Sequence, residues 1–349
     1  MPVFQHDYLH AVTRGIFESA GVPVDEAGII ADRLVSANLV GHDSHGVIRI
    51  PQYVPILQKG EIKPGQPIRL VRETPTTALI DGNWGFGQVV ATKATQLAID
   101  KALANGVSVV CVQNQYHVGR LGDFPELAAR TGLISMATVN GCGAGQRVVP
   151  FGGAEGRFGT NPMAWAIPRR DHEPIVHDFT TSVVAEGKIR LAKNRSKPVP
   201  DGWLLDANGQ PTNDPATLYG NPPGSILPFG GVVAHKGYGL SLVVDILSGA
   251  LSGAGVCRPG PTRMGNGMFI ECFRVDALID PEDFYGAVET LIAHVKSTPT
   301  LPGFDQVLLP GEPELRTRAQ RLQDGIDVED ETWRQIEQAA AMVGYVMPA

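Results

Sequence analysis

The sequence is poor in charge and in cysteine. Charged residues make up 19% of the 349 residues, aromatic residues 7%, and the formal net charge is −7. A weakly acidic chain of this kind lacks the basic surface that nucleic acids and anionic membranes require. Its cysteines are spaced too widely for CxxC or zinc-finger patterns; they are Cys111, Cys142, Cys257 and Cys272. We therefore expect reduced thiols in a cytoplasmic protein.

Long apolar runs are also missing. No window approaches the length of a membrane span, and the N-terminal MPVFQHDYLHAVTRGIFESAG has no apolar run of signal-peptide length. Hydrophobic residues still make up 43%, which is ample for a buried core. At 349 residues we expect one large domain or two intertwined ones.

Hydrophobic periodicity predicts helices at both ends of the chain and strands in the middle. Residues 24–41 carry an apolar helical row, with Asp25 placed to cap the helix and Gly41 to end it. From about residue 66, short apolar runs separated by turns are typical of strands. A long apolar helix at 235–253 is expected to be buried on most sides. An amphipathic helix at 327–345 closes the chain.

These elements predict an α/β fold with a central mixed sheet and a helical layer formed by the N- and C-terminal segments. The expected division is a helical domain from 1–70 and 277–349 and a strand-rich, cofactor-binding domain from 71–276. A Rossmann domain is not expected, because GCGAGQ (141–146) has Gln146 at the position of the third glycine. A dinucleotide would need other glycine-rich turns, and each of those taken singly is more often structural than a ligand site.

One segment, GHDSHGVIRI (41–50), gathers several titratable groups. If Gly41 ends a helix, Ser44 is placed to cap the next one, and His45 and Arg49 would share a face of it. Histidine moves protons near neutral pH, and arginine grips a carboxylate through two parallel hydrogen bonds. Together they meet the needs of a reaction that reduces a 2-oxo acid.

Other interpretations of this segment stay open on the residues alone. His42, Asp43 and His45 could form a metal site, or the segment could be a helix cap with surface polarity. His117, in YHVGR, has the same ambiguity. It could be a turn histidine satisfied by backbone, or a second catalytic or cofactor-facing group.

Six segments carry a resemblance to a known family, in the family's order and over most of the chain. They are GHDSHGVIRIPQY (41–53), YHVGRLGDF (116–124), FGTNPMAWAIP (158–168), DFTTSVVAEGKIR (178–190), HKGYGLSLVVDILSGALSG (235–253) and LLPGEPELRTR (308–318). The chain thereby resembles the malate/L-lactate dehydrogenase family of the second type, which is unrelated to Rossmann lactate dehydrogenases. It is most similar to the bacterial hydroxycarboxylate dehydrogenase branch.

The resemblance implies a non-Rossmann homodimer that binds NAD or NADP and interconverts a 2-oxo acid and a 2-hydroxy acid, with no metal. By the family's pattern His45 is the proton donor, Ser44 orients it, and Arg49 binds the substrate carboxylate. Thr160 would contact the substrate, and His117 is proposed as the base in one branch. The expected cofactor-binding residues are His117, Val118, Gly119, Arg120, Leu121, Asn140, Asp178, Phe179, Thr180, His235, Lys236, Pro310, Gly311 and Glu312.

Lys188 separates two activities within the family. The imine-reducing branch has an acidic residue here, as part of a Ser–His–acid relay, so Lys188 argues against a cyclic-imine carboxylate reductase. It could instead hold the substrate acid or the Ser44 hydroxyl, and we count it among the catalytic candidates. A metal-dependent hydrolase using His42, Asp43 and His45 is the alternative from another class, and a non-enzymatic binding protein is a third.

Overall fold

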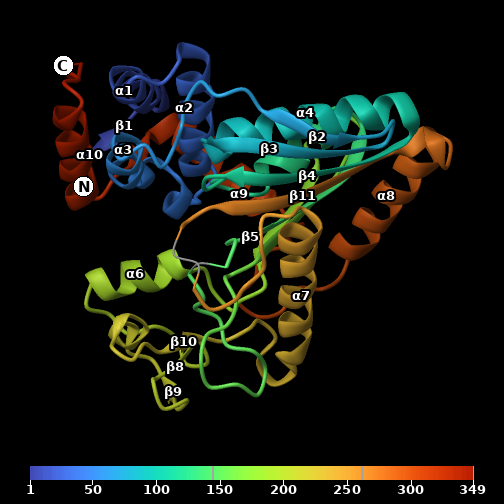
Figure 1. Ribbon diagram of the computed structural model, residues 1–349. Helices are drawn as coiled ribbons and strands as arrows, with labels where there is room; N and C mark the ends of the chain where they lie inside the picture. Colours follow the sequence, from blue (N-terminus) through green and yellow to red (C-terminus); the bar gives the residue numbers. More distant parts are fainter. Residues whose placement is uncertain (144, 261–262, 349) are drawn as a thin grey trace.

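The computed structural model describes residues 1–143, 145–260 and 263–348, and its centre is a seven-stranded sheet (Figure 1). The strand order is β2–β3–β4–β11–β5–β6–β7. Only β3 and β4 run parallel, and every other neighbouring pair in this sheet is antiparallel. The predicted mixed, non-Rossmann sheet is thereby confirmed. The strands are β2 (Arg69–Glu73), β3 (Thr77–Gly85), β4 (Val107–Gln115), β5 (Leu133–Asn140), β6 (Pro162–Ile167), β7 (Ile175–Thr180) and β11 (Asn266–Arg274).

Two helices cover one face of the sheet, α4 (Gly87–Asn105) and α5 (Asp123–Ala129). On α4 the alanines that follow one another at helical spacing are fully buried, and their small side chains let the helix lie close to the strands; they are Ala91, Ala94, Ala98 and Ala102. The helix ends at Gly106, whose φ of 87° is a conformation that glycine adopts readily.

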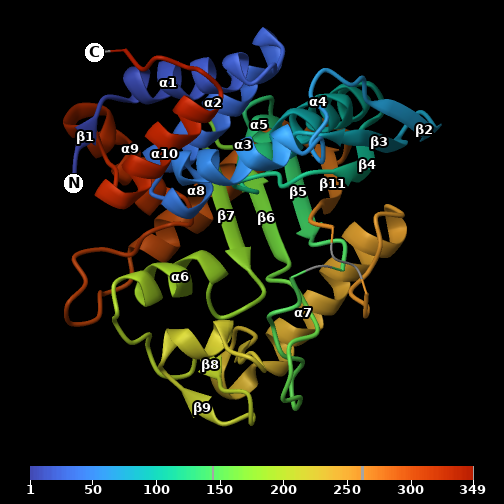
Figure 2. The ribbon, with the colours of Figure 1, turned by 60° about the vertical axis from the view of Figure 1, so that its left-hand side comes forward.

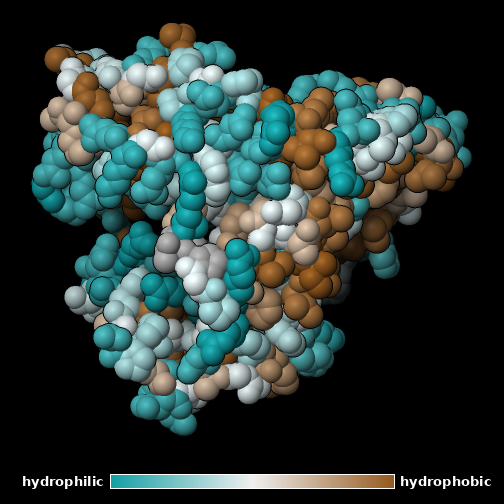
Figure 3. All heavy atoms as spheres, viewed as in Figure 1, coloured by the Kyte–Doolittle hydropathy of each residue, from teal (hydrophilic) through white to brown (hydrophobic). Residues whose placement is uncertain are grey.

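The opposite face of the sheet is only partly covered, by α7 (His235–Asp245) and its π-helical continuation Ile246–Leu251. The prediction that this helix is buried on most sides is wrong. Its outer row is exposed by 42–56% and consists of Leu242, Val243, Ile246 and Leu251. Apolar side chains gather on the side of the molecule where α7 and β11 lie (Figure 3).

The two ends of the chain form one helical layer, as predicted. A shared apolar core joins α1 (His6–Ser19), α2 (Val24–Leu39), α3 (Ile50–Gln58) and α10 (Asp330–Met342). Figure 2 shows the N- and C-terminal segments side by side, and β1 (Val3–Phe4) pairs with β12 (Ile326–Asp327). The helix α9 (Glu312–Asp324) packs against α2.

The helix α8 (Pro281–Lys296) lies outside this layer and forms ion pairs with Arg169 and Arg170, which follow β6. The division of the chain at residues 70 and 277 stays a prediction.

A small lobe lies between β7 and α7. It contains α6 (Glu186–Asn194) and a three-stranded sheet of β8 (Leu204–Leu205), β9 (Pro211–Thr212) and β10 (Ser225–Ile226). Asn208-Gly209 turns the chain between β8 and β9, as the sequence predicts, and Gly209 has φ of 76°. Among the described residues, no helix has both the length and the apolar character to cross a membrane.

Candidate active site

The segment GHDSHGVIRI forms two short 3₁₀ turns instead of one helix. Asp43–His45 and Val47–Arg49 are the turns, and Gly46 lies between them with extended backbone (φ −87°, ψ −151°). The prediction that Ser44 caps a helix carrying His45 and Arg49 on one face is therefore wrong. The predicted cap of α2 by Asp25 is wrong too, because Pro23 occupies the N-cap position.

The physical reason for the broken helix is Asn38, at the end of α2. Its Oδ1 accepts a hydrogen bond from Val47 N at 2.8 Å, and its Nδ2 donates to Asp43 Oδ1 at 2.7 Å. A Cβ on Gly46 would lie 2.1 Å from Asn38 Oδ1, so only glycine leaves room for this side chain. Asn38 thus fixes both turns, which the sequence analysis missed because the residue sits inside an apolar helical stretch.

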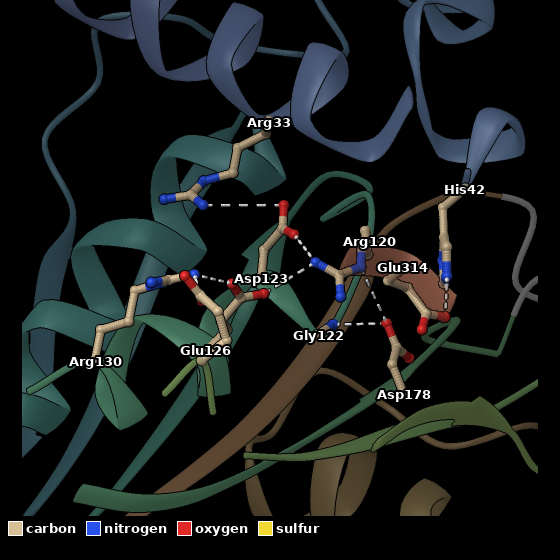
Figure 4. A network of polar contacts seen from close by, with 10 residues as sticks. Arg33, His42, Arg120, Gly122, Asp123, Glu126, Arg130, Asp178 and Glu314 are labelled. Carbon is tan, nitrogen blue, oxygen red and sulfur yellow. Dashed lines mark hydrogen bonds and ion pairs between the residues drawn. The ribbon is translucent and has the colours of Figure 1, made fainter. Parts of the chain in front are cut away.

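His42 and Asp43 face α9, away from a common metal site. His42 Nε2 lies 3.3 Å from Glu314 Oε1, as Figure 4 shows. Asp43 accepts two hydrogen bonds from Arg321, at 2.6 and 3.0 Å. Among the described residues, no group of three or more His, Cys, Asp or Glu side chains is arranged to hold a metal ion. These two residues fasten the turns to the C-terminal part of the helical layer.

Ser44, His45 and Arg49 remain together at the site. Ser44 Oγ lies 3.1 Å from His45 Nδ1. Arg49 donates from Nε to the Ser44 carbonyl at 2.6 Å and from Nη1 to Gln52 Oε1 at 2.7 Å. Among the described residues no carboxylate forms an ion pair with Arg49, and Glu186, whose charge acts on it, is paired with Arg190. An arginine without an acid partner is suited to bind the carboxylate of a ligand.

His117, at the end of β4, completes the site. Its ring stacks on His45 with the centroids 5.5 Å apart and the planes 14° from parallel. Its Nδ1 lies 2.6 Å from the hydroxyl of Tyr53, which accepts a hydrogen bond from Gln88 at 3.0 Å. Tyr53 lies in the quoted RIPQY motif, but Gln88 gave no sequence signal as a site residue.

Burial and one shared cation keep both histidines neutral. Burial, followed by the charge of Arg49, lowers the pKa of His45 to about 3. Burial, followed by Arg49 and His45, holds the pKa of His117 well below its ordinary value. Burial also raises the pKa of Tyr53 to about 12, so the phenol keeps its proton. A negatively charged ligand beside Arg49 would reverse part of this effect.

Three of the five groups of predicted cofactor residues meet at one place. Arg120 donates to Asp123 at 2.7 Å and lies 4.0 Å from Asp178, whose carboxylate accepts from Gly122 N at 2.7 Å (Figure 4). These contacts join the HVGRLG segment to β7. A further hydrogen bond, from Val176 N to Pro310 O at 3.3 Å, joins β7 to the PGE segment. Beside this cluster lies a cavity of about 310 Å³, lined among others by Arg33, Arg130, Glu173, Gly311 and Arg318.

The fourth group, His235 and Lys236, lies exposed at the first turn of α7. Phe229 connects this turn to β7. A Cβ on Gly237 would lie 2.3 Å from Phe229 O, and the Phe229 ring contacts Phe179 edge-on at 5.9 Å. Phe229 thus lies between the first turn of α7 and Phe179 of β7.

Three predicted site residues remain, and they are Asn140, Thr160 and Lys188. The Asn140 side chain is buried and already bonded, donating to Asp245 at 3.1 Å and to the Gly255 carbonyl at 2.9 Å. Thr160 is half-buried just before β6, and its carbonyl accepts from Thr181 N at 3.1 Å. Lys188 is exposed in the first turn of α6, next to a contact in which a Cβ on Gly187 would lie 2.8 Å from Ser44 Cβ. Their predicted roles stay predictions.

Known proteins match the chain over almost its whole length. A family model described as malate/L-lactate dehydrogenase matches residues 4–337. Hydroxycarboxylate dehydrogenase B of Escherichia coli (strain K12) is 37% identical over 346 residues, which cover 98% of this chain and 94% of that protein. The structure of sulfolactate dehydrogenase from Methanocaldococcus jannaschii has a TM-score of 0.89 at 34% identity, covering 99% and 98% of the two chains. Malate dehydrogenase from Pyrococcus horikoshii OT3 has 0.90 at 33%, covering 99% and 97%.

The mixed sheet, the paired histidines and these matches define a dehydrogenase that does not use the Rossmann fold. The chain belongs to the malate/L-lactate dehydrogenase family.

Proposed function

We propose that the protein is an NAD(P)-dependent dehydrogenase that interconverts a 2-oxo acid and a 2-hydroxy acid. The observation that carries this proposal is Arg49, which has no carboxylate partner among the described residues and lies beside the stacked His45 and His117. A 2-oxo acid presents a carboxylate next to a carbonyl. The site offers a fork of N–H donors next to a ring that can carry a proton.

In this proposal each side chain has one task. Arg49 binds the carboxylate, and His45 gives a proton to the carbonyl oxygen in reduction and takes it back in oxidation. Ser44, 3.1 Å from His45 Nδ1, keeps the ring in position. Thr160 and Lys188 are proposed to contact the substrate. Proton transfer by a positioned histidine accelerates a reaction by about 10²–10⁴-fold.

The substrate itself helps to protonate His45. In the free site Arg49 contributes to the lowered pKa of His45, after burial. A carboxylate bound to Arg49 cancels that charge, and the pKa of His45 then rises toward its ordinary value. The proton donor is thereby easier to protonate when an acid substrate is present than in the free site.

The cofactor residues fit a dinucleotide. Lys236 and His235 are exposed at the first turn of α7, where backbone N–H groups and the helix dipole favour a phosphate. Because the carbonyl oxygen of Phe229 would clash with any side chain at position 237, only glycine fits there. We propose that this turn, the HVGRLG and DFT segments and Pro310–Glu312 hold the cofactor. The nicotinamide ring, when bound, supplies or takes up the hydride.

We further propose a homodimer. The exposed row of α7 continues onto the sheet face with half-covered apolar side chains, among them Leu79, Val109, Met163 and Trp165. A contiguous apolar surface of this kind is typical of a permanent subunit contact. Sedimentation of the wild type as a dimer, and of Leu242→Glu as a monomer, is the expected result.

A substrate panel tests the function. Purified protein is mixed with NADH or NADPH, and oxidation of the cofactor is followed after addition of pyruvate, oxaloacetate, hydroxyphenylpyruvate or sulfopyruvate. We expect turnover with at least one of these acids. A cyclic imine carboxylate is included as a comparison, and turnover with that compound alone would assign the imine-reducing activity instead. No turnover with any compound and either cofactor would refute the proposal.

A further inference from the structure

A buried chain of hydrogen bonds ends on one of the two histidines. The Tyr53 hydroxyl lies 2.6 Å from His117 Nδ1, and Gln88 Nε2 lies 3.0 Å from the same hydroxyl. Tyr53 and Gln88 are both fully buried. Neither residue takes part in the proposed proton transfer. Their hydrogen bonds nevertheless end on His117, whose ring faces His45.

The donors in this chain follow from its chemistry. An amide nitrogen can only donate, so the Tyr53 oxygen accepts from Gln88 and directs its single proton to His117 Nδ1. Reversing the Gln88 amide would turn two N–H donors away from the hydroxyl into the interior. In the present orientation only the carbonyl oxygen of Gln88 lacks a partner. Unpaired buried N–H groups are rarer than unpaired carbonyl oxygens, which favours this orientation.

The backbone around His117 is held as firmly as its ring. A Cβ on Gly87 would lie 2.2 Å from the Tyr116 carbonyl oxygen and 2.4 Å from the His117 carbonyl carbon, so α4 begins in direct contact with this strand end. On the other side, Val118 N donates to Asn266 Oδ1 at 3.0 Å. With the backbone fixed, the contact to Tyr53 sets the orientation of the ring.

We infer that Gln88 and Tyr53 fix the tautomer of His117 and thereby its part in the reaction. A neutral ring whose Nδ1 accepts from Tyr53 carries its proton on Nε2. His117 then offers the substrate an N–H donor and has no free lone pair with which to take a proton. The proton transfer falls to His45 alone, while Tyr53 and Gln88 act as positioning residues. The role of His117 in the reaction rests on the proposed dehydrogenase function, whereas its tautomer does not.

The tautomer can be measured without any activity. In protein labelled with ¹⁵N-histidine, the ring nitrogen shifts of His117 are expected to show a bare Nδ1 and a protonated Nε2. His117→Gln identifies the signal. A protonated Nδ1 in the wild type would overturn the inference, whatever the substrate panel shows.

Variants of Tyr53 and Gln88 test whether their hydrogen bonds fix the tautomer of His117. Tyr53→Phe and Gln88→Met are expected to move the His117 shifts toward a mixture of tautomers. Tyr116→Phe is the matched control. It removes a phenol hydroxyl from the ring packed edge-on against Tyr53, and it leaves the hydrogen bonds of Tyr53 to Gln88 and His117 intact. The assignment of Tyr53 fails if Tyr53→Phe leaves the shifts as they are in the wild type.

The role of His117 needs a comparison of two substitutions at that position. Glutamine keeps an N–H donor but has no basic nitrogen, whereas leucine has neither. With an acid that the wild type turns over, His117→Gln is expected to keep at least about tenfold more kcat than His117→Leu, since one hydrogen bond is worth about 1.4 kcal/mol or a factor of ten. Equal loss in both variants would show that a basic nitrogen is needed, and would contradict the donor role.

Discussion

His45 and His117 lie face to face, with ring centroids 5.5 Å apart and planes 14° from parallel. Two charged rings could not lie so close without strong repulsion. Burial and the charge of Arg49 lower the pKa of both, so the rings are neutral together in the free site. In the proposed reaction only one of them gains a proton, and a carboxylate bound to Arg49 would favour that gain.

Replacement of Arg49 tests the carboxylate contact. Arg49→Met is expected to raise KM for the acid by about 10–100-fold, because hydrogen bonds to a charged group contribute about 1.5–3 kcal/mol. Arg49→Lys keeps the charge but loses the planar fork, so its KM should fall between those of the wild type and Arg49→Met. Steady-state kinetics over a range of acid concentrations checks both. An unchanged KM in Arg49→Met would remove Arg49 from the substrate site.

Replacement of His45 tests the proton transfer. His45→Gln is expected to lose about 10²–10⁴-fold in kcat, the usual contribution of a general acid–base group. Ser44→Ala keeps the Cβ that packs against Gly187 and loses only the hydroxyl near Nδ1, so a loss of about tenfold is expected. If His45→Gln keeps kcat within a few-fold of the wild type, another group carries the proton.

The lowered pKa of His45 also predicts how stability depends on pH. The unfolded chain takes up this proton near 6.5, and the folded protein only near 3. Between these values the unfolded state binds more protons, so the contribution of neutral His45 to stability is present above pH 6.5 and is lost as the pH falls toward 3.

Urea unfolding at a series of pH values from neutral to mildly acidic measures this effect. The difference in free energy of unfolding between wild type and His45→Gln should shift in favour of the variant as the pH falls. His117 is present in both proteins, and because burial and Arg49 lower its pKa more than His45 does, most of its own titration is common to the two. A difference that stays constant with pH would contradict the assigned pKa.

Gly187 offers a test of the contact between α6 and the 3₁₀ turns. A Cβ there would lie 2.8 Å from Ser44 Cβ, so Gly187→Ala should displace Ser44 and with it the His45 ring, and kcat should fall. Gly286→Ala in α8 is the control, because its Cβ would meet nothing within 4 Å. There the better helix propensity of alanine should stabilise the fold by up to about 1 kcal/mol without changing kcat. Equal kinetics in both variants would remove this contact from the site.

The Arg120 cluster is expected to matter for stability more than any surface pair. Arg120→Leu leaves Asp123 charged and buried, which should cost about 3–5 kcal/mol of unfolding free energy. Arg130→Leu removes an arginine whose side chain is 45% exposed in its pairs with Glu126 and Glu173, and should cost no more than about 1 kcal/mol. Urea denaturation distinguishes the two. A similar small loss in both would mean that Asp123 is neutral in the folded protein or that Arg33, 3.9 Å away, balances its charge.

Local patterns allowed part of this structure to be predicted. The apolar row of α2 follows from the 3.6-residue helical period, and strands such as β5 follow from short, nearly continuous apolar runs; both patterns involve only neighbouring residues. The break at Gly46 was not predictable in this way, because it depends on a hydrogen bond from Val47 back to Asn38. Spacing suggested that His45 and Arg49 act together, and the structure keeps them in one site although the helix behind that suggestion is absent.

Contacts between distant parts of the chain could not be predicted from the sequence. The outer row of α7 has the composition of a buried helix, and nothing local distinguishes a core from a surface that awaits another subunit. The same holds for the link between Tyr53 and His117, 64 positions apart. Gln88 lies in the first turn of α4, and nothing in the neighbouring sequence indicates that this polar side chain is buried.

The contacts that hold the 3₁₀ turns against α9 have a consequence for the order in which the site forms during synthesis. Ser44 and His45 leave the ribosome early, but Glu314 and Arg321, which fasten the neighbouring His42 and Asp43, are synthesised more than 270 residues later. The strand that pairs with β1 comes later still. During most of translation the nascent chain therefore holds Ser44 and His45 on turns that only the local contacts of Asn38 fix, and the contacts to α9 form after residues 314 and 321 have emerged.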